Sequence, residues 1–199
     1  MKIRSTVAAL SLLALTVPAF AEEKAAGAPA GPSPAEMAAM EKAMSPGPEH
    51  QQMAKGVGDW TYSNTVWMAP GAPPMQSSGT MHAETTLGGR YLVEDWHGMM
   101  MGAPFEGRAT TAYNNLAKHY ESTWVDNMGT GILYSTGNCD AGGVCSYSGD
   151  MWDPMSGKKV TTRSVMSWMG SDTFKLEMYG PGPDGKEMKT MELVAKRKT

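Results

Sequence analysis

The sequence lacks the short motifs that mark most well-known enzyme sites. It contains no G-x-S-x-G nucleophile elbow, no H-E-x-x-H zinc motif, no P-loop and no dinucleotide-binding glycine fingerprint. Its four histidines are not combined with cysteines or carboxylates at the spacing of a zinc site. We therefore expect no catalytic residues and no cofactor, and an enzyme of unknown reaction stays open only as an alternative.

Positive charge is also scarce. The chain has 17 Lys and Arg residues against 20 Asp and Glu residues, and its one basic run is Lys196-Arg197-Lys198. Without Lys2 and Arg4, which lie in an N-terminal segment that we expect to be removed, the formal charge falls from −3 to near −5. Such a chain is poorly suited to nucleic acid or to an anionic membrane surface, and we expect neither as a partner. The sequence carries no signal for an oligomeric state.

Long apolar runs are confined to the N-terminus. Residues 6–17 form an almost unbroken apolar run that is too short to span a bilayer. It follows a basic start and precedes Ala19-Phe20-Ala21, a small-x-small cleavage site. We interpret residues 1–21 as a secretory signal peptide cleaved after Ala21, with an N-terminal membrane anchor as the less favoured alternative. The mature protein is then expected to be periplasmic or secreted, without stable membrane insertion.

Only two cysteines occur, Cys139 and Cys145, and they flank a glycine-rich segment. In an oxidising compartment, cysteines this close together are expected to form a disulfide across the end of a hairpin. A redox-active dithiol is the alternative, but the spacing is C-x5-C instead of C-x-x-C. The pair therefore favours an exported protein with a structural disulfide.

The residues that follow the N-terminal segment divide into a linker, two helices and a β-rich domain. Residues 22–33 are rich in Ala, Gly and Pro and predict a disordered linker. The sequence Ser33-Pro34-Ala35-Glu36 is typical of a helix start and predicts a helix over 34–44. A second helix is predicted over 48–55. We expect the segment 34–57 to pack, as two short helices, on a domain formed by residues 58–199.

Residues 58–199 have the pattern of an all-β domain. Short stretches rich in Thr, Val, Tyr and Trp alternate with turn-forming clusters of Gly, Pro, Asn and Asp. An antiparallel meander of about ten strands is expected to curl and close into a lipocalin-like barrel. With only three Phe residues, its core must use Met, Trp, Tyr and Val, which favours an internal cavity. The predicted strands are 59–68, 76–86, 90–97, 104–113, 118–126, 130–137, 145–152, 158–168, 172–179 and 187–197.

Two of these strands carry candidate ligand-binding residues. Because side chains alternate along a strand, Glu94 and Trp96 share one face, and so do Trp124 and Asp126. Arg90 is in register with Glu94. An acid and a base at these positions would orient the head group of a small apolar or amphipathic ligand inside the barrel. A surface ladder of weak cross-strand ion pairs is the alternative.

Between two of the predicted strands lies an unusual run of methionines. Met99, Met100 and Met101 follow His97 and are flanked by Gly98 and Gly102, which predicts a hairpin connection. At a loop tip, consecutive side chains point in different directions, which is unfavourable for binding one ion. We therefore interpret the three methionines as an adaptable apolar rim of a ligand portal.

Copper binding is a further alternative, since the chain contains 19 methionines and thioethers suit a soft ion such as Cu(I). The plausible clusters are Met81-His82 and His97 with the methionines that follow it. However, the methionines are dispersed along the chain, which is more typical of a flexible core filler. We therefore expect no metal site, and keep His82 and His97 as the residues of the alternative.

Several blocks of the sequence resemble a known family. The blocks "GGRYL", "PFEG" and "WVDNMGTG", between "PGPEHQQMAKGVGDWTYSNTVW" and "GPDGKEMKTMELVAKR", are similar to the bacterial family called domain of unknown function 1579. The likeness covers roughly residues 35–197. It implies a small β-rich domain with no established activity, and it brings no catalytic residues. His97 is not part of the resemblance.

A second resemblance concerns the fold. Gly58-Asp59-Trp60 at the start of the first predicted strand, and Arg197 at the end of the last, look like the Gly-x-Trp and late Arg of lipocalin-like barrels. In those barrels the tryptophan plugs one end, and a cation lies over its ring. The resemblance therefore implies structural roles for Trp60 and Arg197, with their side chains in cation–π contact.

Overall fold

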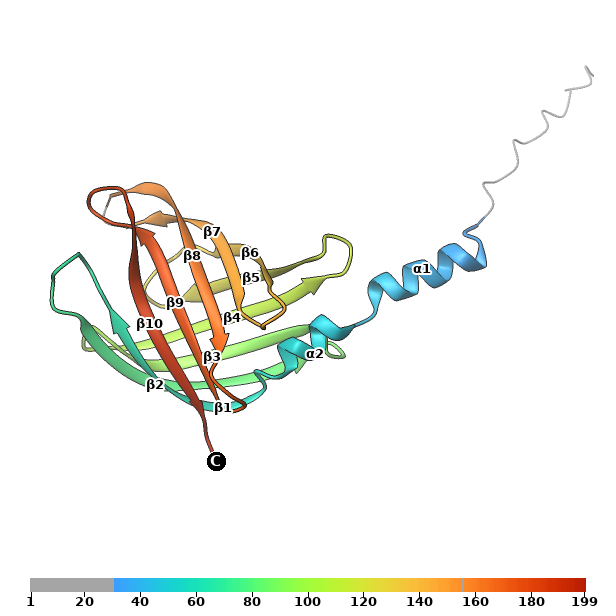
Figure 1. Cartoon of the computed structure of the whole chain (residues 1–199), viewed down its shortest axis with the longest axis horizontal. Helices are drawn as coiled ribbons and strands as arrows, with labels where there is room; N and C mark the ends of the chain where they lie inside the picture. Colours follow the sequence, from blue (N-terminus) through green and yellow to red (C-terminus); the bar gives the residue numbers. More distant parts are fainter. Residues whose placement is uncertain (1–30, 155) are drawn as a thin grey trace, which may run out of the picture.

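The computed structural model describes residues 31–154 and 156–199. Ten antiparallel strands follow one another as a meander, and β1 pairs with β10, so that the sheet closes into a barrel (Figure 1). This confirms the predicted fold class. The strands are β1 Gly58–Val66, β2 Met75–Thr86, β3 Tyr91–Met100, β4 Ala103–Asn114, β5 His119–Asp126, β6 Leu133–Cys139, β7 Cys145–Asp153, β8 Lys158–Trp168, β9 Thr173–Pro181 and β10 Glu187–Arg197.

Two short helices precede the barrel. Helix α1, Pro34–Met44, begins at Ser33, whose hydroxyl accepts a hydrogen bond from the backbone N–H of Glu36. Helix α2, Pro48–Ala54, buries His50 and Met53 and packs against β3 and β4. Helix α1 buries no side chain and projects away from the barrel in Figure 1. Only the C-terminal end of α1 touches the barrel domain, where the carbonyls of Ala43 and Met44 accept hydrogen bonds from Asn115 and Arg90.

The predicted signal peptide and most of the predicted linker lie outside the described residues. Within the part of the chain that the structure describes, no helix has the length and apolar character needed to cross a bilayer.

The barrel core forms because apolar side chains alternate with exposed ones along each strand. In β1, Trp60, Tyr62 and Asn64 are buried while the residues between them are exposed. The largest fully buried side chains are Trp60 and Met81, which face each other across the β1–β2 pair. The most completely buried part of the core therefore lies where the first, second and last strands meet.

The connection between β3 and β4 is shorter than the sequence predicts. Strand β3 continues through Met100, and the turn consists of Met101 and Gly102, with φ angles of 50° and 81°. Two consecutive positive φ angles are typical of the tight two-residue turn that joins hairpin strands. Met99 and Met100 thus pair with Pro104 and Ala103 in the sheet. The prediction that all three methionines lie at a loop tip is therefore wrong for these two.

Candidate ligand-binding cavity

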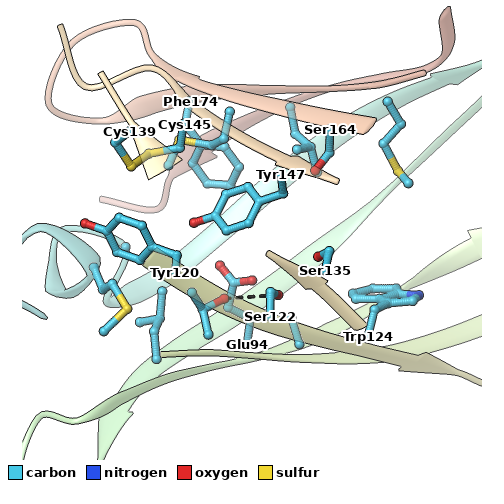
Figure 2. Close-up of a pocket in the computed structure, with 18 of the residues that line it drawn as sticks. Glu94, Tyr120, Ser122, Trp124, Ser135, Cys139, Cys145, Tyr147, Ser164 and Phe174 are labelled. Atoms are coloured by element: carbon cyan, nitrogen blue, oxygen red, sulfur yellow. Dashed lines mark hydrogen bonds between the residues drawn. A yellow bond between two sulfur atoms is a disulfide. The ribbon is translucent and has the colours of Figure 1, made fainter. Parts of the chain in front are cut away.

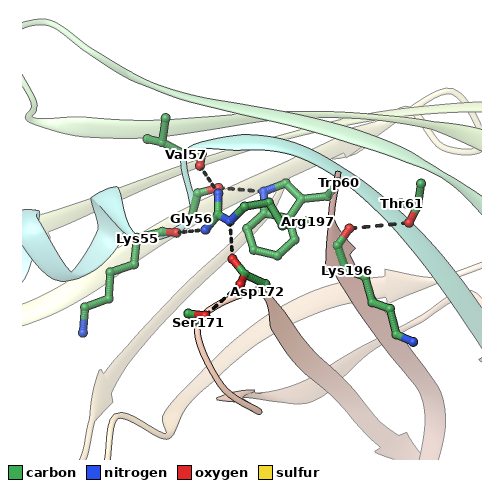
Figure 3. Close-up of polar contacts among 9 residues, drawn as sticks. All are labelled: Lys55, Gly56, Val57, Trp60, Thr61, Ser171, Asp172, Lys196 and Arg197. Atoms are coloured by element: carbon green, nitrogen blue, oxygen red, sulfur yellow. Dashed lines mark hydrogen bonds and ion pairs between the residues drawn. The ribbon is translucent and has the colours of Figure 1, made fainter. Parts of the chain in front are cut away.

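One end of the barrel is closed by Trp60. Its indole N–H donates a hydrogen bond of 2.9 Å to the carbonyl of Gly56, directly after α2. The Arg197 guanidinium carbon lies 4.2 Å from the Trp60 ring centroid, which is the contact that the lipocalin-like resemblance implies. The guanidinium also donates to the carbonyls of Lys55 and Val57 and to Asp172 (Figure 3). We call Trp60 and Arg197 together the Trp60 plug, and every polar group of their side chains thus has a hydrogen-bond partner.

Above the plug the barrel is hollow. A cavity of about 240 Å³ extends from Gln52 and Met53 of α2 to Trp124 of β5. Its aromatic lining comes from five strands: Trp96 of β3, Tyr120 and Trp124 of β5, Tyr147 of β7, Trp168 of β8 and Phe174 of β9. Cys139 and Cys145 form the disulfide that the sequence predicts, and both of them line the cavity (Figure 2).

The hollow exists because the inward-facing side chains on one side of the barrel wall are small. Ala109, Ser122, Ser135 and Ser164 line the cavity from β4, β5, β6 and β8. On the opposite side, β1, β2 and β10 turn larger side chains such as those of Trp60, Met81 and Leu193 into the core. The barrel is therefore packed on one side and open inside on the other.

Glu94 is the charged residue of the cavity lining. It lies deep in the barrel, and its side chain keeps partial accessibility because it faces the cavity (Figure 2). Burial disfavours the charged carboxylate and raises the pKa of Glu94 to about 7. The neighbouring Trp96 indole acts in the opposite direction, but its Nε1 atom is buried without a hydrogen-bond partner. Near neutral pH, both forms of Glu94 are therefore populated.

Two tyrosines share the cavity with Glu94: Tyr147 lies across it, and Tyr120 lies on β5, in the same wall as Glu94 (Figure 2). Burial, with smaller contributions from Tyr120 and Glu94, raises the pKa of Tyr147 well above its usual range. Burial also raises the pKa of Tyr120, whose hydroxyl donates to the backbone carbonyl of Glu49 at 3.4 Å. Both phenols are therefore neutral at physiological pH and offer hydroxyl groups together with ring faces.

Three of the predicted ligand-binding residues, Glu94, Trp96 and Trp124, come together in the cavity. Asp126 is not in the lining; it accepts a hydrogen bond of 2.7 Å from the Trp124 indole N–H. Arg90 is not in the lining either, because it precedes β3 in a turn where strand alternation does not apply. Its guanidinium donates to the carbonyls of Leu87 and Met44. The expected pairing of Arg90 with Glu94 on one strand face is therefore not formed.

The three consecutive methionines also lie outside the cavity lining. Met99 and Met101 are half to two-thirds exposed, while Met100 packs against the buried core. Their alternation in and out follows the strand period and not the geometry of a shared rim. The structure therefore places them beside the barrel core and not around the cavity.

The residues of the copper alternative do not converge. Met81 is buried inside the barrel, whereas His82 is exposed and bonds Asp59 at 2.8 Å through Nδ1. His97 is exposed on β3 and pairs with Thr80 and Glu106 of the flanking strands. In the described ranges, no group of three or more His, Cys, Asp or Glu side chains is arranged to hold a metal ion.

Sequence reasoning did not identify the tyrosines and serines of the lining. Tyr120, Ser122 and Trp124 occupy alternate positions of β5, so the same rule that paired Trp124 with Asp126 leads back to Tyr120. Tyr147 is likewise two residues from Cys145 on β7. The alternation signal was therefore present in the sequence, but it does not say which face of a strand is turned inward.

The fold and the cavity define the class: a small closed β-barrel with a ligand-sized hollow. Residues 45–197 match the family model described as "Protein of unknown function (DUF1579)", and the chain belongs to this family. This confirms the family resemblance found in the sequence. None of the curated proteins matches the chain.

Two solved structures share the fold. The crystal structure of Rv2717c from M. tuberculosis has a TM-score of 0.56 at 14% identity, and the match covers 78% of this chain and 100% of that one. The S-type phycobiliprotein lyase CPES from Guillardia theta has a TM-score of 0.56 at 10% identity, with 81% and 97% covered. At such identities the likeness extends to the fold alone.

Proposed function

We propose that this protein binds a small, mainly apolar molecule inside its barrel and does no chemistry on it. The observation that carries the proposal is the cavity of about 240 Å³ between the Trp60 plug and Trp124. Apolar cavities with a few convergent polar groups are the usual form of small-molecule sites. The phycobiliprotein lyase among the structural neighbours supports a small-molecule role for a barrel of this shape.

We also propose that binding takes place outside the cytoplasm. The N-terminal sequence has the layout of a signal peptide, and the Cys139–Cys145 disulfide suits an oxidising compartment. Cell fractionation with mass measurement of the purified protein tests this. We expect a periplasmic or secreted chain that begins at Glu22; an uncleaved cytoplasmic chain would contradict it.

Filling the cavity tests the binding proposal. We expect native mass spectrometry to show a co-purified small molecule, and a neutral fluorescent probe such as N-phenyl-1-naphthylamine to bind the emptied protein. The variant Ser135→Phe places a ring in the cavity and should reduce probe affinity at least tenfold. Ser146→Phe, on the exposed face of β7, is the matched control and should leave it unchanged.

Circular dichroism and urea unfolding establish that both variants are folded. The proposal fails if neither probe nor co-purified molecule binds the folded wild-type protein. It fails as well if Ser135→Phe binds the probe as tightly as Ser146→Phe does, because binding would then lie outside the cavity.

A further inference from the structure

The carboxyl group of Glu94 in the cavity wall is only weakly satisfied by the protein. The side chain that acts on it is the neighbouring Trp96 indole, which lowers the pKa of Glu94 less than burial raises it, and the indole Nε1 lacks a hydrogen bond of regular geometry. Buried polar groups in proteins are almost always paired, because leaving them unpaired costs free energy. A carboxyl group that lines the hollow with so weak a partner therefore indicates a group supplied from outside the chain.

The charged side chain that lines the hollow is acidic. Among the described residues that line it there is no Lys, Arg or His side chain, so Glu94 has no cationic partner within the cavity. The rings of Trp96, Tyr120, Trp124 and Tyr147 line the same cavity, and Figure 2 shows those of Tyr120, Trp124 and Tyr147 around it. A carboxylate together with aromatic faces is the combination that recognises an organic cation, by ion pairing and by cation–π contact.

We infer that the ligand is a small organic amine, whose ammonium group binds the Glu94 carboxylate while its apolar body fills the hollow between the aromatic rings. This rests on the proposed function, since it names the chemistry of a molecule held in the same cavity. The hollow, at about 240 Å³, lies just below the usual range of ligand sites, roughly 300–1,000 Å³. The volume therefore favours a single-ring or short-chain amine over a lipid with long acyl chains.

A neutral ligand would use Glu94 differently, and pH separates the two cases. A protonated Glu94 donates a hydrogen bond to a carbonyl or hydroxyl, whereas an ionised Glu94 binds a cation. The titratable group that interacts with Glu94 is Tyr147 of β7, and Tyr120 of β5 lies next to Tyr147; both stay neutral over this range. Affinity for an amine should therefore rise between pH 6 and pH 8, and affinity for a neutral acceptor should fall.

The experiment compares 2-phenylethylamine with 2-phenylethanol, which have the same ring and nearly the same shape. Calorimetry or tryptophan fluorescence at pH 6 and pH 8 gives the affinity of each for the wild-type protein and two variants. Glu94→Gln removes the cavity carboxylate. Glu106→Gln is the control, since it removes the same charge from the exposed face of the adjacent strand β4.

We expect the amine to bind the wild-type protein and Glu106→Gln at least tenfold more tightly than the alcohol at pH 8. Glu94→Gln should abolish this preference and leave alcohol binding nearly unchanged. The inference is overturned if the alcohol binds as well as the amine, or if Glu94→Gln retains the preference. These results would leave the proposed function intact, because the cavity would still bind the neutral probe. Absence of binding by both compounds and by the neutral probe would overturn both proposals.

Discussion

The Trp60 plug and the cavity lined by Glu94 lie in the same barrel, but they differ in how far the protein satisfies the hydrogen-bonding groups of their side chains. At the plug, the indole N–H and three of the guanidinium nitrogens each have an oxygen partner, and Trp60 has no exposed surface. In the cavity, the indole of Trp96 has no partner and a carboxyl group faces a hollow. Trp60 thus belongs to a closed core and Trp96 to an open site.

The contrast separates structural from functional residues without any knowledge of a reaction. Where the fold satisfies every donor and acceptor, substitution should cost stability. Where it leaves them unsatisfied, the ligand-free protein carries a cost that substitution should relieve. The sign of the stability change is therefore the quantity that tells the two regions apart.

The largest expected effect is at the plug. Trp60→Ala should destabilise the protein by about 3–5 kcal/mol, because it empties a fully buried site and removes the partner of Gly56 and Arg197. Urea unfolding measures the change. Trp152→Ala removes a tryptophan that is 70% exposed, and should cost less than about 0.5 kcal/mol. Similar losses at the two positions would remove the distinction between plug and surface.

A change of the opposite sign is expected in the cavity. The folded-state pKa of Glu94 is raised from 4.5 to about 7. The protonated side chain therefore contributes fully to the free energy of unfolding below pH 4.5, and this contribution is lost as the pH rises through 7. Ligand-free Glu94→Gln should thus match the wild-type protein near pH 4 and be more stable at pH 8. The gain is at most on the order of 3 kcal/mol, and less where cavity water screens the charge.

Urea unfolding at the two pH values gives this difference, with Glu106→Gln as the reference for removal of an exposed charge. A Glu94→Gln variant that is less stable than the wild-type protein at pH 8 would show that the carboxylate is held by the protein. The cavity would then resemble the plug, because its carboxyl group would also be satisfied by the protein.

The smallest expected effect concerns the guanidinium at the plug. Arg197→Gln should cost about 1–2 kcal/mol, since it removes hydrogen bonds to backbone carbonyls and the contact with the Trp60 ring. Lys196→Gln removes the same charge from the exposed neighbouring residue and should have little effect. Equal effects of the two substitutions, measured by thermal unfolding, would mean that net charge and not the plug matters.

The fold could be predicted because the meander repeats one simple pattern. Alternation and turn residues placed all ten strands, and the lipocalin-like resemblance placed Trp60 beside Arg197. The β3–β4 connection was predicted too long because Gly98 looks like a turn residue. It lies in a strand instead, where a side chain would collide with the hydroxyl of Tyr62 and the carbonyl of Ser78. Close approach and turn formation both select glycine, and the sequence does not distinguish them.

The site was only partly predictable for a related reason. Glu94 and Asp95 are adjacent acids on one strand, so one of them must face inward and the other outward. Asp95 has an outward partner in Arg108, at 2.6 Å, but this pairing depends on the register between β3 and β4. Arg90 was misplaced because its position in a turn breaks the alternation. Which acid enters the barrel is thus decided by pairing between strands.

The pairing of β1 with β10 also sets the order in which the molecule can be completed. Trp60 lies opposite Arg197, so the two ends of the barrel domain must meet before the sheet has no free edge. Contacts this distant in sequence form slowly, because the intervening chain must first be brought together. Closure of the sheet and the contact between Trp60 and Arg197 therefore both depend on the last strand, whereas the cavity is lined by residues that precede it.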